Sequence, residues 1–89
     1  MIQNYLPLID TIIEAFLFLE SSGEEEVNLD SAVRCMENMS SSLLTMTKSD
    51  QFALRSHLEK IADESQDPAY KGFVGALPDM IGLAKPLQG

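Results

Sequence analysis

Apolar residues recur along this chain at the three- and four-residue spacing of an α-helix, in four successive segments. No stretch alternates apolar and polar residues with a period of two, which is the pattern of a half-buried β-strand. One segment is especially regular, because its apolar residues are spaced 3, 4, 3, 4 and 3 apart along one side of a helix: Leu29, Ala32, Met36, Met39, Leu43 and Met46. The sequence therefore predicts an all-α fold.

The expected helix boundaries follow from capping residues, glycine and proline. Asn28, Thr47 and Asp67 are good N-cap residues, and Gly23 marks the end of the first helix. Pro78 breaks or bends a helix, which leaves room for a short C-terminal helical turn over 78–83. We expect the four helices at about 4–21, 29–46, 48–64 and 68–77.

The connections between these helices are short, and short connections favour antiparallel neighbours. A chain of 89 residues has the length of one domain. We therefore expect a single helical domain over 1–89, folded as an antiparallel up-down bundle of four helices.

The chain is strongly acidic. Six Lys and Arg residues against fourteen Asp and Glu residues give a formal net charge of -8. Binding to a nucleic-acid backbone requires clustered cations, so we do not expect a nucleic-acid partner. The partner that this charge favours is another protein with a basic surface.

The most apolar stretch, 6–19, has the character of a core helix. Asp10, Thr11 and Glu14 interrupt it, and it is shorter than the roughly 20 residues that span a bilayer. The first residues carry no Lys or Arg, so the charged region of a signal peptide is absent. Cys35 is the single cysteine and has no intramolecular disulfide partner. We therefore predict a cytoplasmic protein that does not bind membranes.

Acidic residues gather at two of the expected helix junctions. In an up-down bundle, the end of the first helix and the start of the second share one pole with the end of the third and the start of the fourth. Such a pole is interpreted either as a docking surface for a basic partner or as a solvated end that keeps the protein soluble. The residues of this predicted acidic pole are Glu20, Glu24, Glu25, Glu26, Asp30, Asp63, Glu64 and Asp67.

Phe18 and Phe52 point away from the main apolar stripes of their helices. Either the fourth helix covers one of them, or they belong to an exposed patch that contacts a partner or a second copy of the chain. Homodimer formation through Phe18 would reduce the large exposed surface of a chain this small. A self-associating structural or adaptor protein is therefore the alternative functional hypothesis.

Cys35 and His57 are the only pair that could form a thiolate–imidazole nucleophile. Both fall at the edges of apolar stripes, where a small thiol and a boundary imidazole also occur without a catalytic role. No glycine-rich phosphate loop, EF-hand loop or zinc-ligand spacing accompanies them. We therefore predict a protein without enzymatic activity, metal site or cofactor.

A weak resemblance covers about two-thirds of the chain, from Asn28 to Leu83. It rests on Leu43-Leu44-Thr45-Met46-Thr47, Asp50, Leu54, Leu58-Glu59-Lys60-Ile61-Ala62, Phe73 and Leu77-Pro78. The segment loosely resembles the small, acidic, all-helical bacterial immunity proteins that are encoded beside polymorphic toxins. The resemblance implies a non-enzymatic inhibitor whose acidic surface plugs the active site or nucleic-acid groove of a basic toxin. It assigns no role to an individual residue.

Overall fold

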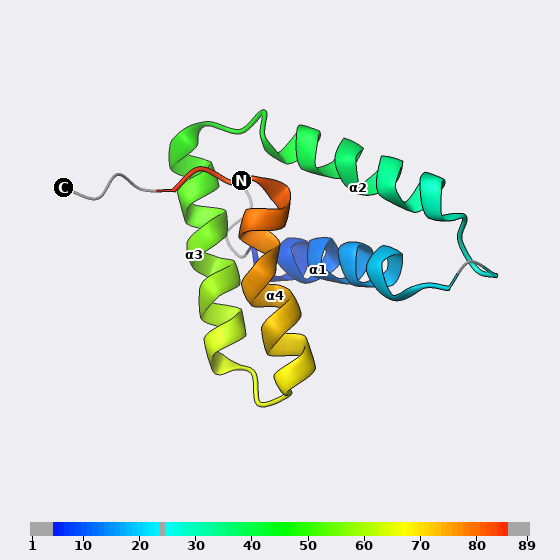
Figure 1. Cartoon of the computed structure of the whole chain (residues 1–89). Helices are drawn as coiled ribbons and strands as arrows, with labels where there is room; N and C mark the ends of the chain where they lie inside the picture. The colour runs from blue at the N-terminus through cyan, green and yellow to red at the C-terminus, as the bar shows by residue number, and fades with distance from the viewer. Residues whose placement is uncertain (1–4, 24, 86–89) are drawn as a thin grey trace. The chain divides into compact units, whose positions relative to one another are not determined.

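The computed structural model describes residues 5–23 and 25–85, which contain four α-helices and no strand. The all-α prediction is therefore confirmed for this part of the chain. The helices, labelled in Figure 1, are α1 (Leu6–Ser21), α2 (Leu29–Leu43), α3 (Lys48–Glu64) and α4 (Pro68–Ile81).

The chain divides into two compact units, which we call unit 1 (Met1–Asn38) and unit 2 (Met39–Gly89). Unit 1 contains α1 and most of α2, and unit 2 contains the end of α2 together with α3 and α4. A single domain over 1–89 stays a prediction. None of the described helices has both the length and the apolar composition needed to cross a bilayer.

In unit 1, the two helices differ in how much of their apolar face is buried. α1 begins with Pro7 in its first turn, and it buries Ile9, Ile13 and Phe16, which lie on one face. The expected start near residue 4 falls outside the described residues. In α2, by contrast, Ala32 is the single buried residue, although the helix is clearly amphipathic in sequence.

α2 begins where the sequence predicts and ends three residues earlier than expected. The Asn28 side chain accepts a hydrogen bond of 3.2 Å from the Ser31 N–H, as an N-cap does. At the other end, the N–H groups of Thr45 and Met46 bond to carbonyls three residues back instead of four. This tighter turn ends α2 before Thr47 caps the start of α3.

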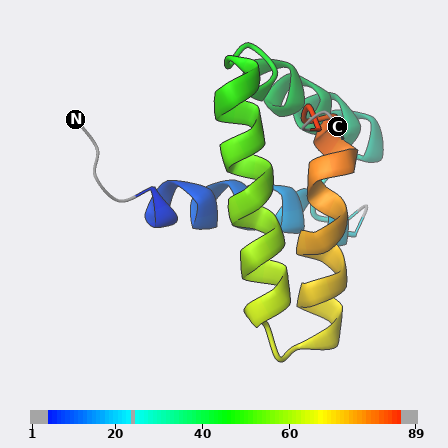
Figure 2. The ribbon, with the colours of Figure 1, turned by 90° about the vertical axis from the view of Figure 1, so that its left-hand side faces the viewer.

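In unit 2, α3 and α4 form a helical hairpin. The two helices lie side by side and run in opposite directions, joined by a short loop (Figures 1 and 2). Thr47 and Asp67 cap them, because their side chains accept hydrogen bonds from the N–H groups of Asp50 and of Ala69 and Tyr70. The buried apolar residues of the hairpin are Leu54, Leu58, Ala62, Val74, Leu77 and Ile81.

Pro78 does not end α4, contrary to the expected boundary at 77. The helix runs through Pro78 to Ile81, so there is no separate turn over 78–83. Pro78 donates no backbone hydrogen bond, but its carbonyl still accepts hydrogen bonds from the N–H groups of Gly82 and Leu83. Gly82 then stops the helix with a φ of 90°, in the left-handed region that glycine adopts without strain.

Candidate functional site

Two polar side chains of α3, Gln51 and Arg55, are buried, with 7% and 8% of their surfaces exposed. They lie on the face of the helix that also carries Leu54, Leu58 and Ala62. A buried polar side chain is costly unless it is hydrogen-bonded. The hydrogen-bond partners of Gln51 and Arg55 therefore show which segments of the chain these two side chains hold against α3.

Gln51 joins three segments of unit 2. Its Nε2 donates hydrogen bonds to the carbonyls of Leu44 at 3.2 Å and Met46 at 2.9 Å. Its Oε1 accepts a hydrogen bond of 2.9 Å from the Ala84 N–H. The amide thus connects α3 both to the turn after α2 and to the segment after α4.

Arg55 holds the same C-terminal segment one turn further along α3. Its guanidinium donates to the carbonyls of Leu83 at 2.8 Å and Ala84 at 3.3 Å. It also donates to the carboxylate of Asp79 at 3.1 Å, and the Lys85 ammonium lies 3.7 Å from the same oxygen. The hydrogen bond from Arg55, followed by the charge of Lys85, lowers the pKa of Asp79 below its ordinary value of 3.8.

We call Gln51, Arg55 and the backbone of Leu83 and Ala84 the C-terminal clasp. Among the described residues, no buried side-chain nitrogen or oxygen lacks a hydrogen-bond partner. The polar groups of the clasp are therefore engaged with the chain's own backbone and, for Arg55, also with Asp79, and they hold the segment after α4 against α3. The clasp was not predicted from the sequence, although two polar residues on the apolar stripe of a predicted helix indicate buried hydrogen bonds.

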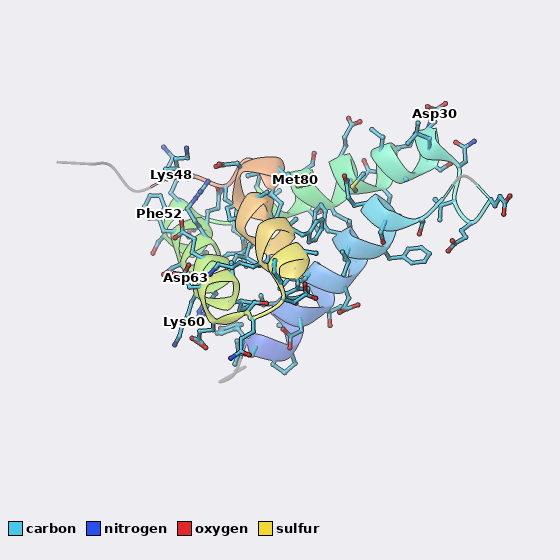
Figure 3. The ribbon with its side chains drawn as sticks, turned by 60° about the horizontal axis from the view of Figure 1, so that its bottom comes forward. Asp30, Lys48, Phe52, Lys60, Asp63 and Met80 are labelled. Atoms are coloured by element: carbon cyan, nitrogen blue, oxygen red, sulfur yellow. The ribbon has the colours of Figure 1, made fainter. Side chains whose placement is uncertain are left out.

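The residues of the predicted acidic pole are exposed wherever the structure describes them. Glu24 lies outside the described residues. Asp67 caps α4, and Glu64 lies 3.9 Å from the ammonium of Lys60 in an exposed pair of little energetic weight. Figure 3 shows Lys60 and Asp63 near the same end of α3. The other exposed members are Glu20, Glu25, Glu26 and Asp30.

The predicted pole draws on both units. The residues from Glu20 to Asp30 belong to unit 1, and those from Asp63 to Asp67 belong to unit 2. Their gathering at one end of the protein stays a prediction, as does the antiparallel order of all four helices.

The negative charge is divided very unevenly between the units. Residues 1–38 contain eight acidic residues and one basic residue, Arg34, which gives a formal charge of -7. Residues 39–89 contain six acidic and five basic residues, which gives -1. Almost the whole net charge of -8 is thus carried by unit 1.

Exposed apolar side chains are concentrated in the same unit. Phe18, predicted as a self-association residue, is 54% exposed, whereas Phe52 on α3 is half-buried. Of the eight large apolar side chains exposed in the described part of the chain, six belong to unit 1: Tyr5, Leu6, Leu8, Phe18, Leu29 and Val33. Unit 1 therefore carries most of the net negative charge and most of the large apolar side chains that are exposed in the described part of the chain.

Cys35 and His57 are both exposed, on α2 of unit 1 and on α3 of unit 2 respectively. Within the described ranges, no group of three or more His, Cys, Asp or Glu side chains is placed to hold a metal ion. The prediction that the protein is not an enzyme stays a prediction.

No protein-family model matches the chain, and no curated protein or solved structure matches it either. The resemblance to bacterial immunity proteins therefore remains an expectation from the sequence.

Proposed function

We propose that this chain is a non-enzymatic protein-binding protein of the immunity or inhibitor type, which binds a basic partner protein. The observation that carries the proposal is the exposed acidic surface. Seven of the eight predicted binding carboxylates are described and all seven are exposed, and the one ion pair among them is the loose contact between Lys60 and Glu64. Exposed carboxylates attract a basic partner and speed its association.

The proposal includes an antiparallel up-down arrangement of the four helices, which would bring both acidic groups to one pole. Spin labels at Glu25 and Glu64 measure this directly, because pulsed EPR reports distances between two labelled sites. A short distance with a narrow distribution supports the common pole. A long distance would restrict the binding surface to one unit.

A cytoplasmic location also belongs to the proposal, because the single cysteine suits a reducing compartment.

The test begins with a partner captured on the immobilised chain and identified by mass spectrometry. Its affinity for the purified chain is then measured by calorimetry at low and high salt. We expect the Kd to rise strongly with salt, because salt screens exposed charges. A Kd that does not change with salt would rule out binding through the acidic residues.

Neutral variants locate the surface that the partner contacts. One variant carries Glu25→Gln, Glu26→Gln and Asp30→Asn, and a second carries Asp63→Asn, Glu64→Gln and Asp67→Ser. Serine keeps an N-cap at position 67, so the second variant removes charge without removing the cap. Glu59→Gln is the matched control, because Glu59 is an exposed carboxylate outside the predicted pole. We expect at least one triple variant to weaken binding by about tenfold or more, corresponding to about 1.4 kcal/mol.

The exposure of Phe18 favours a second candidate function, self-association as a homodimer. The two candidates differ in their response to salt. Pairing two copies through the acidic unit 1 requires like charges to approach, so added salt would strengthen a dimer and weaken a complex with a basic partner. Light scattering on wild type and Phe18→Ser over a range of salt concentrations distinguishes them. Identical monomer masses would exclude the dimer.

A further inference from the structure

We infer that the exposed flank of α2, formed by Leu29 and Val33, docks a basic amphipathic helix of another protein. This inference rests on the proposed function and names the site and the kind of partner. Leu29 is 60% exposed and Val33 is 41% exposed. They lie four residues apart, so their side chains are neighbours on one face of the helix.

Less of the apolar face of α2 is buried than its amphipathic sequence would lead one to expect. Its sequence has a continuous apolar face, and yet Ala32 is its one buried residue. A helix of 15 residues is marginally stable by itself and gains most of its stability from packing of its apolar face. The serine residues 40–42 add little helical propensity. A partner that covers Leu29 and Val33 would therefore stabilise α2.

The charges around this flank define the partner. Glu37 lies one helical turn beyond Val33, on the side of α2 that carries Leu29 and Val33. Asp30 follows Leu29 in the first turn of the helix, where Figure 3 labels it. All four residues are exposed. Arg34 is the one basic residue of unit 1. An apolar face bordered by carboxylates is complementary to a helix with an apolar stripe between Lys and Arg residues.

The same charges disfavour two other occupants. A second copy would bring two units of formal charge -7 together. An anionic lipid surface would be repelled for the same reason. A basic protein helix is the occupant that satisfies both the apolar and the electrostatic character of this face.

The test uses a synthetic peptide of about five helical turns, with Leu on one face and Lys on the other. Fluorescence anisotropy of the labelled peptide measures its binding to the full chain. Two control peptides accompany it, one with the same composition in a scrambled order and one with Glu in place of Lys. We expect the amphipathic Lys peptide to bind and both controls to bind at least about tenfold more weakly.

The variant Leu29→Gln with Val33→Gln removes the apolar contact and keeps residues that are compatible with a helix. Met80→Gln is the matched control, because Met80 is an exposed apolar residue on α4 of unit 2. Circular dichroism confirms that each variant is folded. We expect the double variant to weaken peptide binding by about tenfold and Met80→Gln to leave it unchanged.

The outcomes separate this inference from the proposed function. Equal binding by the double variant and wild type overturns the inference, as does equal binding of the scrambled peptide. Loss of binding only in a variant with Glu25→Gln and Glu26→Gln would overturn the α2 face while supporting the acidic surface of the proposed function. A mass increase at high concentration that Leu29→Gln with Val33→Gln abolishes would identify a second copy as the occupant and overturn the inference.

Discussion

The side-chain oxygen of Gln51 accepts a hydrogen bond of 2.9 Å from the backbone N–H of Ala84, which lies 33 residues further along the chain. The same amide group donates to the carbonyls of Leu44 and Met46. One buried side chain therefore holds the turn after α2 and the segment after α4 against α3.

Gln51→Glu should destabilise unit 2. The substitution keeps an acceptor for the Ala84 N–H but removes the Nε2 donor and places a carboxylate against the carbonyls of Leu44 and Met46. We expect the free energy of unfolding to fall by about 1–3 kcal/mol, the usual cost of unpaired buried polar groups. Urea unfolding measures it. Gln66→Glu introduces the same charge at an exposed position and should change stability far less.

Asp79 should make stability sensitive to acid. Its pKa in the folded state lies below 3.8, mainly because Arg55 donates a hydrogen bond to it. The carboxylate therefore stabilises the fold above its unfolded pKa, and this stabilisation is lost as the pH falls through the folded pKa. Urea unfolding at pH 6 and pH 3 should show a smaller loss of stability for Asp79→Asn than for wild type. Asp63→Asn, which removes an exposed carboxylate, should follow the wild-type dependence, and equal curves for all three proteins would contradict the assignment.

Replacing glycine with alanine should have opposite effects on stability at two positions, one inside α4 and one directly after it. Gly82→Ala forces a side chain into a φ of 90° and should lower stability by about 1–2 kcal/mol. Gly72 lies inside α4 with no atom near the position of an added Cβ. Gly72→Ala should therefore raise stability by about 0.5–1 kcal/mol, since alanine favours the helix. Thermal unfolding of both variants checks the pair, and a loss of stability in Gly72→Ala would contradict it.

Leu58→Ala should be strongly destabilising. Leu58 of α3 is completely buried. Removing its side chain leaves a cavity, and we expect a loss of about 2–5 kcal/mol. The matched control is Leu44→Ala, because Leu44 is substantially exposed and should cost much less. Comparable losses for the two variants in chemical denaturation would mean that Leu58 is not part of a well-packed core.

The sequence contained enough information to place the helices, because the signals that start a helix are local. Asn28, Thr47 and Asp67 act as N-caps by bonding to N–H groups two or three residues away. Helix ends were harder to predict. Pro78 was expected to interrupt α4, but its carbonyl still accepts the hydrogen bonds that continue the helix to its end.

The C-terminal clasp could not be derived from local patterns. The position of Gln51 on an apolar stripe shows that the side chain needs partners, but its partner Ala84 is distant in sequence. The exposure of Leu29 could not be predicted either, because spacing defines the apolar face of a helix and does not say what covers it. The distribution of charge between the two units required knowing where one compact unit ends and the next begins.

The position of Gln51 has a consequence for circular permutation of unit 2. Its hydrogen bonds bring the backbones of Leu44 and Ala84 to the same turn of α3, so the two ends of the stretch from Leu44 to Ala84 lie close together. A permuted fragment could join these two ends through a brief linker and start instead at Gln66, an exposed position between α3 and α4. The rearranged chain would retain every contact of the clasp while reversing the order in which the two helices are synthesised.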